Sequence, residues 1–171
     1  MLNLRSAAVP SDDDLIRWSL DNPGFRFEFV TGETLVTPAG GRSGLRNAKL
    51  HLELGAWAEA HGFQAFGSST GFVFGDLKVS PDEALLRAGR FSALSEDDQE
   101  KLVPLAPDVA VEILPKSQQH GKEREGVHAK CDAMARPGVG YVVLLDPFAK
   151  TVHEWGTQPA SFPDLTIVFD V

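Results

Sequence analysis

The spacing of hydrophobic and polar residues near the start of the chain predicts a β-hairpin. Three phenylalanines alternate with polar residues over 25–30, which is the period of a strand with one buried face, and Glu28 points to the opposite face. Thr31 and Gly32 form a turn into a second strand, Glu33 to Thr37. An N-terminal hairpin is therefore expected.

Two longer segments, 43–61 and 123–136, carry apolar residues at helical spacing and are predicted to be helices. The stripes that would face the core are Leu50, Leu54 and Trp57 in the first helix and Val127, Cys131 and Met134 in the second. Pro137 and Gly138 would close the second helix. Because Cys131, the single cysteine, lies on an apolar stripe, we interpret it as a core residue rather than a nucleophile.

Short apolar runs elsewhere predict the remaining strands. They are 63–74 (one or two strands), 77–87, 108–114, 139–145, 151–155 and 165–171. The run 139–145 is almost continuously apolar, as expected for a central strand covered on both faces, and the last two runs would be added at an edge. The pattern predicts an α/β (α+β) fold with one mixed central sheet flanked by helices.

The length and composition favour one globular domain over residues 1–171. The chain has 171 residues, 43% of them hydrophobic and 23% charged, which is enough for a substantial core. No apolar run approaches the roughly 20 residues that span a bilayer. The N-terminus lacks the basic start of a signal peptide and a lone cysteine forms no intrachain disulfide, so a cytoplasmic protein without a membrane partner is expected.

The net charge of −8 argues against broad electrostatic binding of nucleic acid, which needs clustered lysines and arginines. It does not exclude a nuclease, because active-site acids and a local basic strip can coexist. The segment 116–136 is the one basic stretch near the carboxylates discussed next.

Three acids, Asp82, Asp108 and Glu112, stand at the edges of short apolar runs, where an unpaired carboxylate would be costly. A bound divalent cation would explain several acids on one sheet. Asp108 and Glu112 would lie roughly 13 Å apart along one strand, too far to share an ion directly. We therefore expect Asp82, from a neighbouring strand, to partner Glu112, while Asp108 anchors the strand start or binds a lysine or arginine. The alternative is that these acids are surface residues at strand ends.

Four motifs carry a resemblance to a known family. They are the segment 27–33, the tripeptide Ser80-Pro81-Asp82, the strand 106–114, and Gly138-Val139 followed by 142–147. Each is weak alone, but in this order and at these separations they resemble the Uma family of "putative restriction endonucleases", a branch of the PD-(D/E)xK nuclease superfamily. The resemblance covers nearly the whole chain. It implies a restriction-endonuclease-like fold and hydrolysis of DNA phosphodiester bonds with Mg²⁺ or Mn²⁺.

The resemblance also implies roles for particular residues. Asp82 and Glu112, with the backbone carbonyl of Ile113, would bind the metal. The superfamily carries a lysine two residues after its strand carboxylate, where this chain has Leu114. The resemblance assigns that role to Lys130 on the following helix.

Other assignments stay open at this point. Lys116 is the rival lysine, since it follows the strand directly. Glu28 would be an outer metal ligand, a general base or an exposed strand acid. Two departures from the family pattern stand out: Pro115-Lys116-Ser117 replaces a serine–proline–serine turn, and Asn47 stands where the family often has a histidine.

Two alternative functions remain. The first is a catalytically silent relative that binds nucleic acid or a partner protein, favoured by the acidic charge and by Leu114. The second is a structural homodimer, based on the apolar segment 165–169 acting as an exposed strand edge that pairs with another copy.

Overall fold

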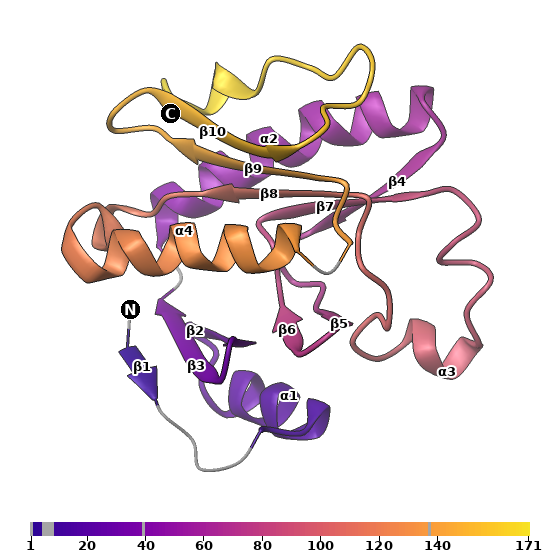
Figure 1. Cartoon of the computed structure of the whole chain (residues 1–171), viewed down its shortest axis with the longest axis vertical. Coiled ribbons are helices and arrows are strands. Elements are labelled where there is room, and N and C mark those ends of the chain that lie inside the picture. The colour runs from indigo at the N-terminus through magenta and orange to yellow at the C-terminus, as the bar shows by residue number, and fades with distance from the viewer. Residues whose placement is uncertain (1, 5–8, 39, 137) are drawn as a thin grey trace.

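The structure is a computed structural model that describes residues 2–4, 9–38, 40–136 and 138–171. The described residues form two five-stranded sheets with helices packed on them (Figure 1). One sheet is mixed and flanked by helices, which confirms the predicted fold class. The second sheet is antiparallel, so the expectation of one sheet alone was wrong.

The mixed sheet contains the strand with Glu112 at its centre. In spatial order its strands are β10 (Thr151–Gly156), β9 (Tyr141–Asp146), β8 (Val109–Ile113), β7 (Glu83–Arg87) and β4 (Phe63–Gly67). β8 and β9 are parallel, and the other neighbours are antiparallel. Glu83 pairs with Val111 across β7 and β8, and this register sets Asp82 beside Glu112.

The antiparallel sheet contains the predicted hairpin, which is confirmed as β2 and β3. In spatial order its strands are β1 (Leu2–Leu4), β3 (Glu33–Pro38), β2 (Phe25–Val30), β6 (Leu77–Val79) and β5 (Phe72–Phe74). The expected strand 77–87 is divided into β6 and β7, because Pro81 has no N–H to give to a strand ladder. At Ser80-Pro81-Asp82 the chain thus passes from one sheet to the other.

The two predicted long helices cover opposite faces of the mixed sheet (Figure 1). α2 (Gly41–Ala60) packs Leu50 and Leu54 against one face, and α4 (Gly121–Ala135) packs its predicted stripe, Cys131 included, against the other. Pro137, which was expected to close α4, lies outside the described residues. The shorter helices are α1 (Asp12–Asp21) and α3 (Glu96–Gln99). None of the helices in the described ranges is long and apolar enough to span a membrane.

The last predicted strand, 165–171, was wrong. Leu165–Val168 form a short 3₁₀ helix, η2, whose Leu165 and Val168 are buried in the core that α2 shares with the mixed sheet. Residues three apart lie on one side of a 3₁₀ helix, so the apolar pattern is satisfied by packing inward. The Nε1–H of Trp57 also donates to the carbonyl of Ser161, at 2.7 Å. The argument for a homodimer through this segment therefore loses its basis.

Candidate active site

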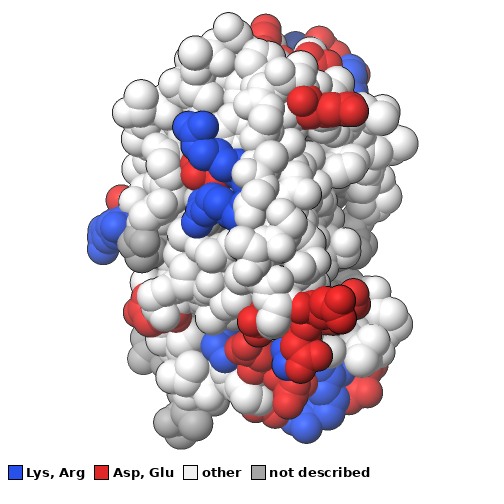
Figure 2. All heavy atoms as spheres, turned by 90° about the vertical axis from the view of Figure 1, so that its right-hand side faces the viewer, with Lys and Arg blue, Asp and Glu red and all other residues white. Residues whose placement is uncertain are grey.

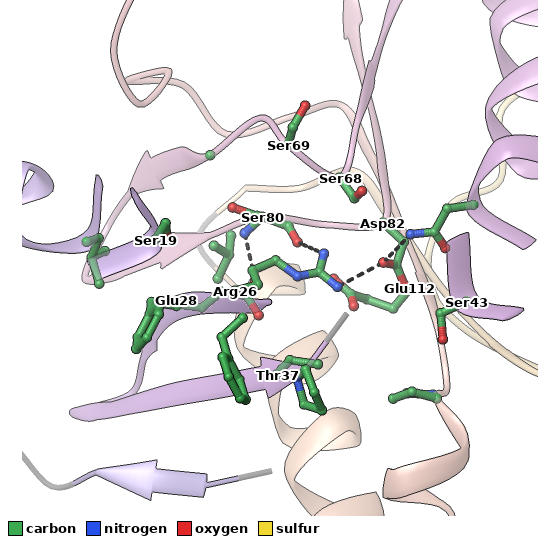
Figure 3. A pocket seen from close by; sticks show the side chains of 18 of the residues that line it. Ser19, Arg26, Glu28, Thr37, Ser43, Ser68, Ser69, Ser80, Asp82 and Glu112 are labelled. Atoms are coloured by element: carbon green, nitrogen blue, oxygen red, sulfur yellow. Dashed lines mark hydrogen bonds and ion pairs between the residues drawn. The ribbon is translucent and has the colours of Figure 1, made fainter. Parts of the chain in front are cut away.

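A cavity of about 580 Å³ is lined by residues of both sheets and of helices α1, α2 and α4. Three acids (Glu28, Asp82 and Glu112) and one lysine, Lys130, contribute to its wall. All four side chains are buried. Figure 3 shows how Glu28 approaches from one sheet, and Asp82 and Glu112 from the other.

Lys130 joins two of these acids. Its Nζ atom lies 2.7 Å from Oε1 of Glu112 on β8 and 2.7 Å from Oε1 of Glu28 on β2. The same Glu28 oxygen accepts the backbone N–H of Ser80 at 2.7 Å. The structure thus brings together Lys130 and Glu112, as the sequence led us to expect, and adds Glu28 to them.

The position of Glu28 differs from what the strand alternation suggested. The phenylalanine face was expected to be the buried one, yet Phe25 is 49% exposed and Glu28 only 2%. The later half of β2 is buried on both faces, and the side chain of Glu28 contacts Lys130 of α4 and the backbone N–H of Ser80, which follows β6. Glu28 is therefore not an exposed strand acid.

Asp82 is held by three donors. Its Oδ1 accepts hydrogen bonds from Nη2 of Arg26 and from Nδ2 of Asn47, each at 3.1 Å, and its Oδ2 accepts the backbone N–H of Ile113 at 2.8 Å. Nη1 of Arg26 donates to the carbonyl of Ser80 at 2.9 Å (Figure 3). These contacts fix the carboxylate from β2, α2 and β8 at once.

The charges in the site explain the shifted pKa values. Burial opposes charge on Lys130, but Glu112 and Glu28 outweigh it and raise the pKa of Lys130 above its usual range. Burial raises the pKa of Glu112, and Asp82 and Glu28 raise it further, while Lys130 opposes them. Three acids face two cations, Lys130 and Arg26, so the fully ionised group carries one surplus negative charge.

Two contacting residues, Arg26 and Asn47, were not identified as part of the site from the sequence. Arg26 precedes Glu28 by two positions on β2, so strand alternation alone could have placed both on one face. Its pKa is raised, because Asp82, Glu28 and Glu112 together outweigh the effect of burial. Asn47 stood out as a departure from the family pattern, and the structure shows that it contacts Asp82.

Two of the supporting candidates lie elsewhere. Oδ2 of Asp108 accepts the backbone N–H of Arg87 at 2.7 Å and pairs with Nη1 of Arg90 at 2.8 Å, so Asp108 has the anchoring contacts that were one of its expected roles. Lys116 begins the short 3₁₀ helix η1 (Lys116–Gln118), is exposed and does not line the cavity. Lys130 is therefore the lysine that reaches the acids.

A second acid lies directly after Asp82 but on the opposite face of the sheet. Both carboxylate oxygens of Glu83 lie within hydrogen-bond distance of Nδ1 of His51, at 2.9 and 3.0 Å. Burial raises the pKa of Glu83 to about 7, with Asp82 adding to the shift and His51 opposing it. Strand alternation separates Glu83 from Glu112, so this pair is distinct from the one bound by Lys130.

The carboxylates of the site are in part suited to a divalent metal ion. Within the described ranges, no three His, Cys, Asp or Glu side chains are arranged to hold one ion together. Asp82 and Glu112 are neighbours on adjacent strands, and Oε1 of Glu112 is buried without a hydrogen bond to the described residues, its contact being the ion pair with Lys130. Two neighbouring carboxylates suit a hard cation such as Mg²⁺. A cation would also offset the surplus negative charge.

The fold that holds this site is shared with a solved structure. The chain is similar to the crystal structure of "a putative nuclease belonging to DUF820" from Anabaena variabilis ATCC 29413, with a TM-score of 0.65 and 17% sequence identity. The match covers 94% of this chain and 98% of that one. At this identity the likeness shows the fold, which is restriction-endonuclease-like.

The family follows from the sequence match. The family model Uma2, described as "Putative restriction endonuclease", matches residues 12–164. The chain belongs to the Uma2 family, which confirms the resemblance drawn from the four motifs. No curated protein sequence matches the chain.

Proposed function

We propose that the protein is a metal-dependent endonuclease that hydrolyses phosphodiester bonds of DNA. The observation that carries the proposal is the position of Lys130, whose ammonium group lies 2.7 Å from both Glu112 and Glu28 in a cavity that also holds Asp82. Two acids and a lysine are the groups that the resemblance predicted to act together. Membership of a family described as restriction endonucleases supports a nuclease.

In this proposal Asp82 and Glu112, with the carbonyl of Ile113, hold Mg²⁺ or Mn²⁺. The ion supplies an activated water and neutralises charge on the phosphate. Arg26 and Asn47 donate hydrogen bonds to Asp82 and so fix the orientation of its carboxylate. Such outer contacts set the orientation and affinity of metal ligands.

Lys130 is assigned to the phosphate. A fixed ammonium group in a water-poor site stabilises negative charge that develops during hydrolysis. Glu28 is assigned a positioning role, because its Oε1 holds the Lys130 ammonium and the Ser80 N–H rather than facing the cavity unpaired. Glu28 is therefore expected to affect the reaction by positioning Lys130.

The proposed substrate approaches the cavity rather than a broad charged surface. On the face seen in Figure 2, lysine and arginine side chains form separate small groups, and acids dominate the lower group. This face lacks the continuous basic strip that a duplex-binding surface presents. No broad basic surface is therefore invoked on this face, and attraction of nucleic acid is assigned to residues near the cavity.

The test is cleavage of supercoiled plasmid DNA, with an RNA of similar length in parallel, in Mg²⁺ or Mn²⁺. Glu112→Gln is expected to abolish cleavage and also the rise in melting temperature that the metal gives the native protein. Asp108→Asn is the matched control, since Asp108 is a paired acid directly before the same strand and outside the cavity. No cleavage of either nucleic acid at high protein, with an equal metal effect in both variants, would reject the proposal.

A catalytically silent binding domain is the second candidate. It is favoured by the contacts that the acids make within the protein, since Arg26 and Asn47 bind Asp82 and Lys130 binds Glu112. Nucleic-acid binding that is insensitive to metal and to Glu112→Gln would support it. The homodimer and the cytoplasmic location stay predictions, and light scattering at working concentration would settle the first.

A further inference from the structure

The start of helix α2, with its first backbone N–H groups, lines the same cavity as the acids. Gly40, Ser43 and Gly44 all contribute to the cavity wall, and Figure 3 shows Ser43 on the same side as Asp82 and Glu112. The cap residue Gly40 provides no side-chain hydrogen bond, and the first turn contains no acid. The first N–H groups of an α-helix have no partner within the helix and carry partial positive charge.

Gln118 supplies the second, independent observation. Its side chain is 2% exposed, lines the cavity, and its Nε2 makes no hydrogen bond to the described residues. A buried amide donor without a partner is costly, because it has lost its contacts with water. An acceptor brought by a ligand would satisfy it.

The donors at this end of the cavity favour an anion. Backbone N–H groups, a serine hydroxyl and an amide match the several acceptor oxygens of a phosphate. The arginines of the same helix, Arg42 and Arg46, do not line the cavity, and the guanidinium of Arg46 lies 5.0 Å from the ring centre of Phe148.

We propose that the first turn of α2 and the Gln118 amide bind a phosphate group of the nucleic acid, next to the phosphate that is cleaved at Asp82 and Glu112. The proposal rests on the proposed function and deepens it, since it assigns the residues that hold the strand beside the reaction centre. The phosphate would come from the interior of a strand or from a 5′-terminus.

The test measures binding without cleavage, in EDTA, with three probes: a fluorescent oligonucleotide with a 5′-phosphate, the same oligonucleotide with a 5′-hydroxyl, and inorganic phosphate as a competitor. Gln118→Glu keeps the side-chain shape and replaces the donor with a carboxylate. Its dissociation constant for the oligonucleotide is expected to rise roughly tenfold or more, as for the loss of a charged hydrogen bond. Gln119→Glu makes the same charge change at a residue outside the cavity wall and is expected to have no such effect.

Ser43→Asp is the second variant, in case Gln118→Glu does not fold. A carboxylate in the first turn stabilises a helix, so the melting temperature should rise while oligonucleotide binding weakens. Equal loss with both oligonucleotides supports the site and indicates an internal phosphate, whereas loss confined to the 5′-phosphate form supports it and indicates a terminal one. An effect of the variants on inorganic phosphate alone would overturn the assignment to nucleic acid.

Unchanged binding of all three probes in both variants overturns the site. The outcome is separable from that of the proposed catalysis. Native cleavage with an unchanged KM in Gln118→Glu and Ser43→Asp would reject the phosphate site and leave the nuclease intact. Probe binding that depends on Gln118, in a protein that cleaves neither DNA nor RNA, would keep the site and reject the catalysis.

Discussion

Nζ of Lys130 lies 2.7 Å from Oε1 of Glu112, although the lysine is on a helix and the glutamate is on the strand beneath it. Leu114, at the position where the superfamily carries its lysine, is fully buried in the core that α4 shares with the sheet. The ammonium group of Lys130 therefore reaches Glu112 from the helix layer. The strand position that would carry the lysine is occupied by Leu114, which packs in the core.

The first prediction concerns the stability that Lys130 gives. Lys130→Met leaves Glu28 and Glu112 buried without their shared cation, so the free energy of unfolding at neutral pH should fall by about 3–5 kcal/mol. Urea unfolding measures it. Adding Glu28→Gln to Lys130→Met should recover part of the loss. Lys116→Met, at an exposed lysine, should change stability by no more than about 0.5 kcal/mol. A Lys130→Met protein as stable as the native one would show that the ion pairs are not formed.

The second prediction concerns Asn47. Asn47→Ala removes a 3.1 Å hydrogen bond to Asp82, so the carboxylate is held less firmly. The Mg²⁺ concentration at half-maximal thermal stabilisation should rise about 10–100-fold. Lys49→Ala, at an exposed residue on the same helix, is the control. An unchanged midpoint in Asn47→Ala would remove Asp82 from the metal ligands or Asn47 from its support.

The third prediction concerns pH and Asp146. Although burial opposes ionisation, the backbone N–H groups of Phe148 and Ala149 and the guanidinium of Arg124 lower the pKa of Asp146. A depressed folded-state pKa gives stability that is present above the unfolded value of 3.8 and is lost as the pH falls through the lower, folded value. Asp146→Asn should therefore cost about 1–3 kcal/mol at pH 7, from the loss of hydrogen bonds to a buried charge.

The cost of Asp146→Asn should shrink as the pH falls below 3.8. Denaturant unfolding of both proteins across that range measures the difference. Asp170→Asn, at an exposed ion pair with Lys150, should show no comparable cost. A difference that is constant with pH would mean that Asp146 acts through shape and not through charge.

The fourth prediction tests whether the C-terminal segment forms the observed 3₁₀ helix or the exposed strand that the sequence suggested. Val168→Asp places a charge in the core beside α2 and should lower the free energy of unfolding by about 3 kcal/mol or more. Val152→Asp, on the edge strand β10, should change it little, because Val152 is 40% exposed. If light scattering instead showed that Val168→Asp halves the molecular mass at unchanged stability, the segment would be an interface.

The sequence predicted the helices and strands in which a regular spacing of apolar residues extends over the whole element. The alternation of β2 and the apolar stripes of α2 and α4 identified these elements within a few residues of their observed bounds. The second sheet was missed, because the pairing of β2 with β6 depends on where the chain turns at Pro81 and not on any local pattern. The 3₁₀ helix η2 was misread, since a short apolar run fits either structure.

The site was predicted in part for the same reason. The neighbourhood of Asp82 and Glu112 followed from strand spacing, and the reach of Lys130 followed from the family resemblance. The burial of Glu28 and the contacts of Arg26 arise where the two sheets contact each other. The periodicity of hydrophobic residues does not predict which sheets come into contact. Such residues become recognisable when the tertiary structure is known.

The ion-paired group also links the two sheets, since Glu28 belongs to one, Glu112 to the other, and Lys130 contacts both. A small separation of the sheets on warming would part these charges while most helices and strands persisted. Under the proposed function, loss of cleavage is then expected at a lower temperature than loss of the helical circular dichroism signal. The working range of such an enzyme would be narrower than the range over which it stays folded.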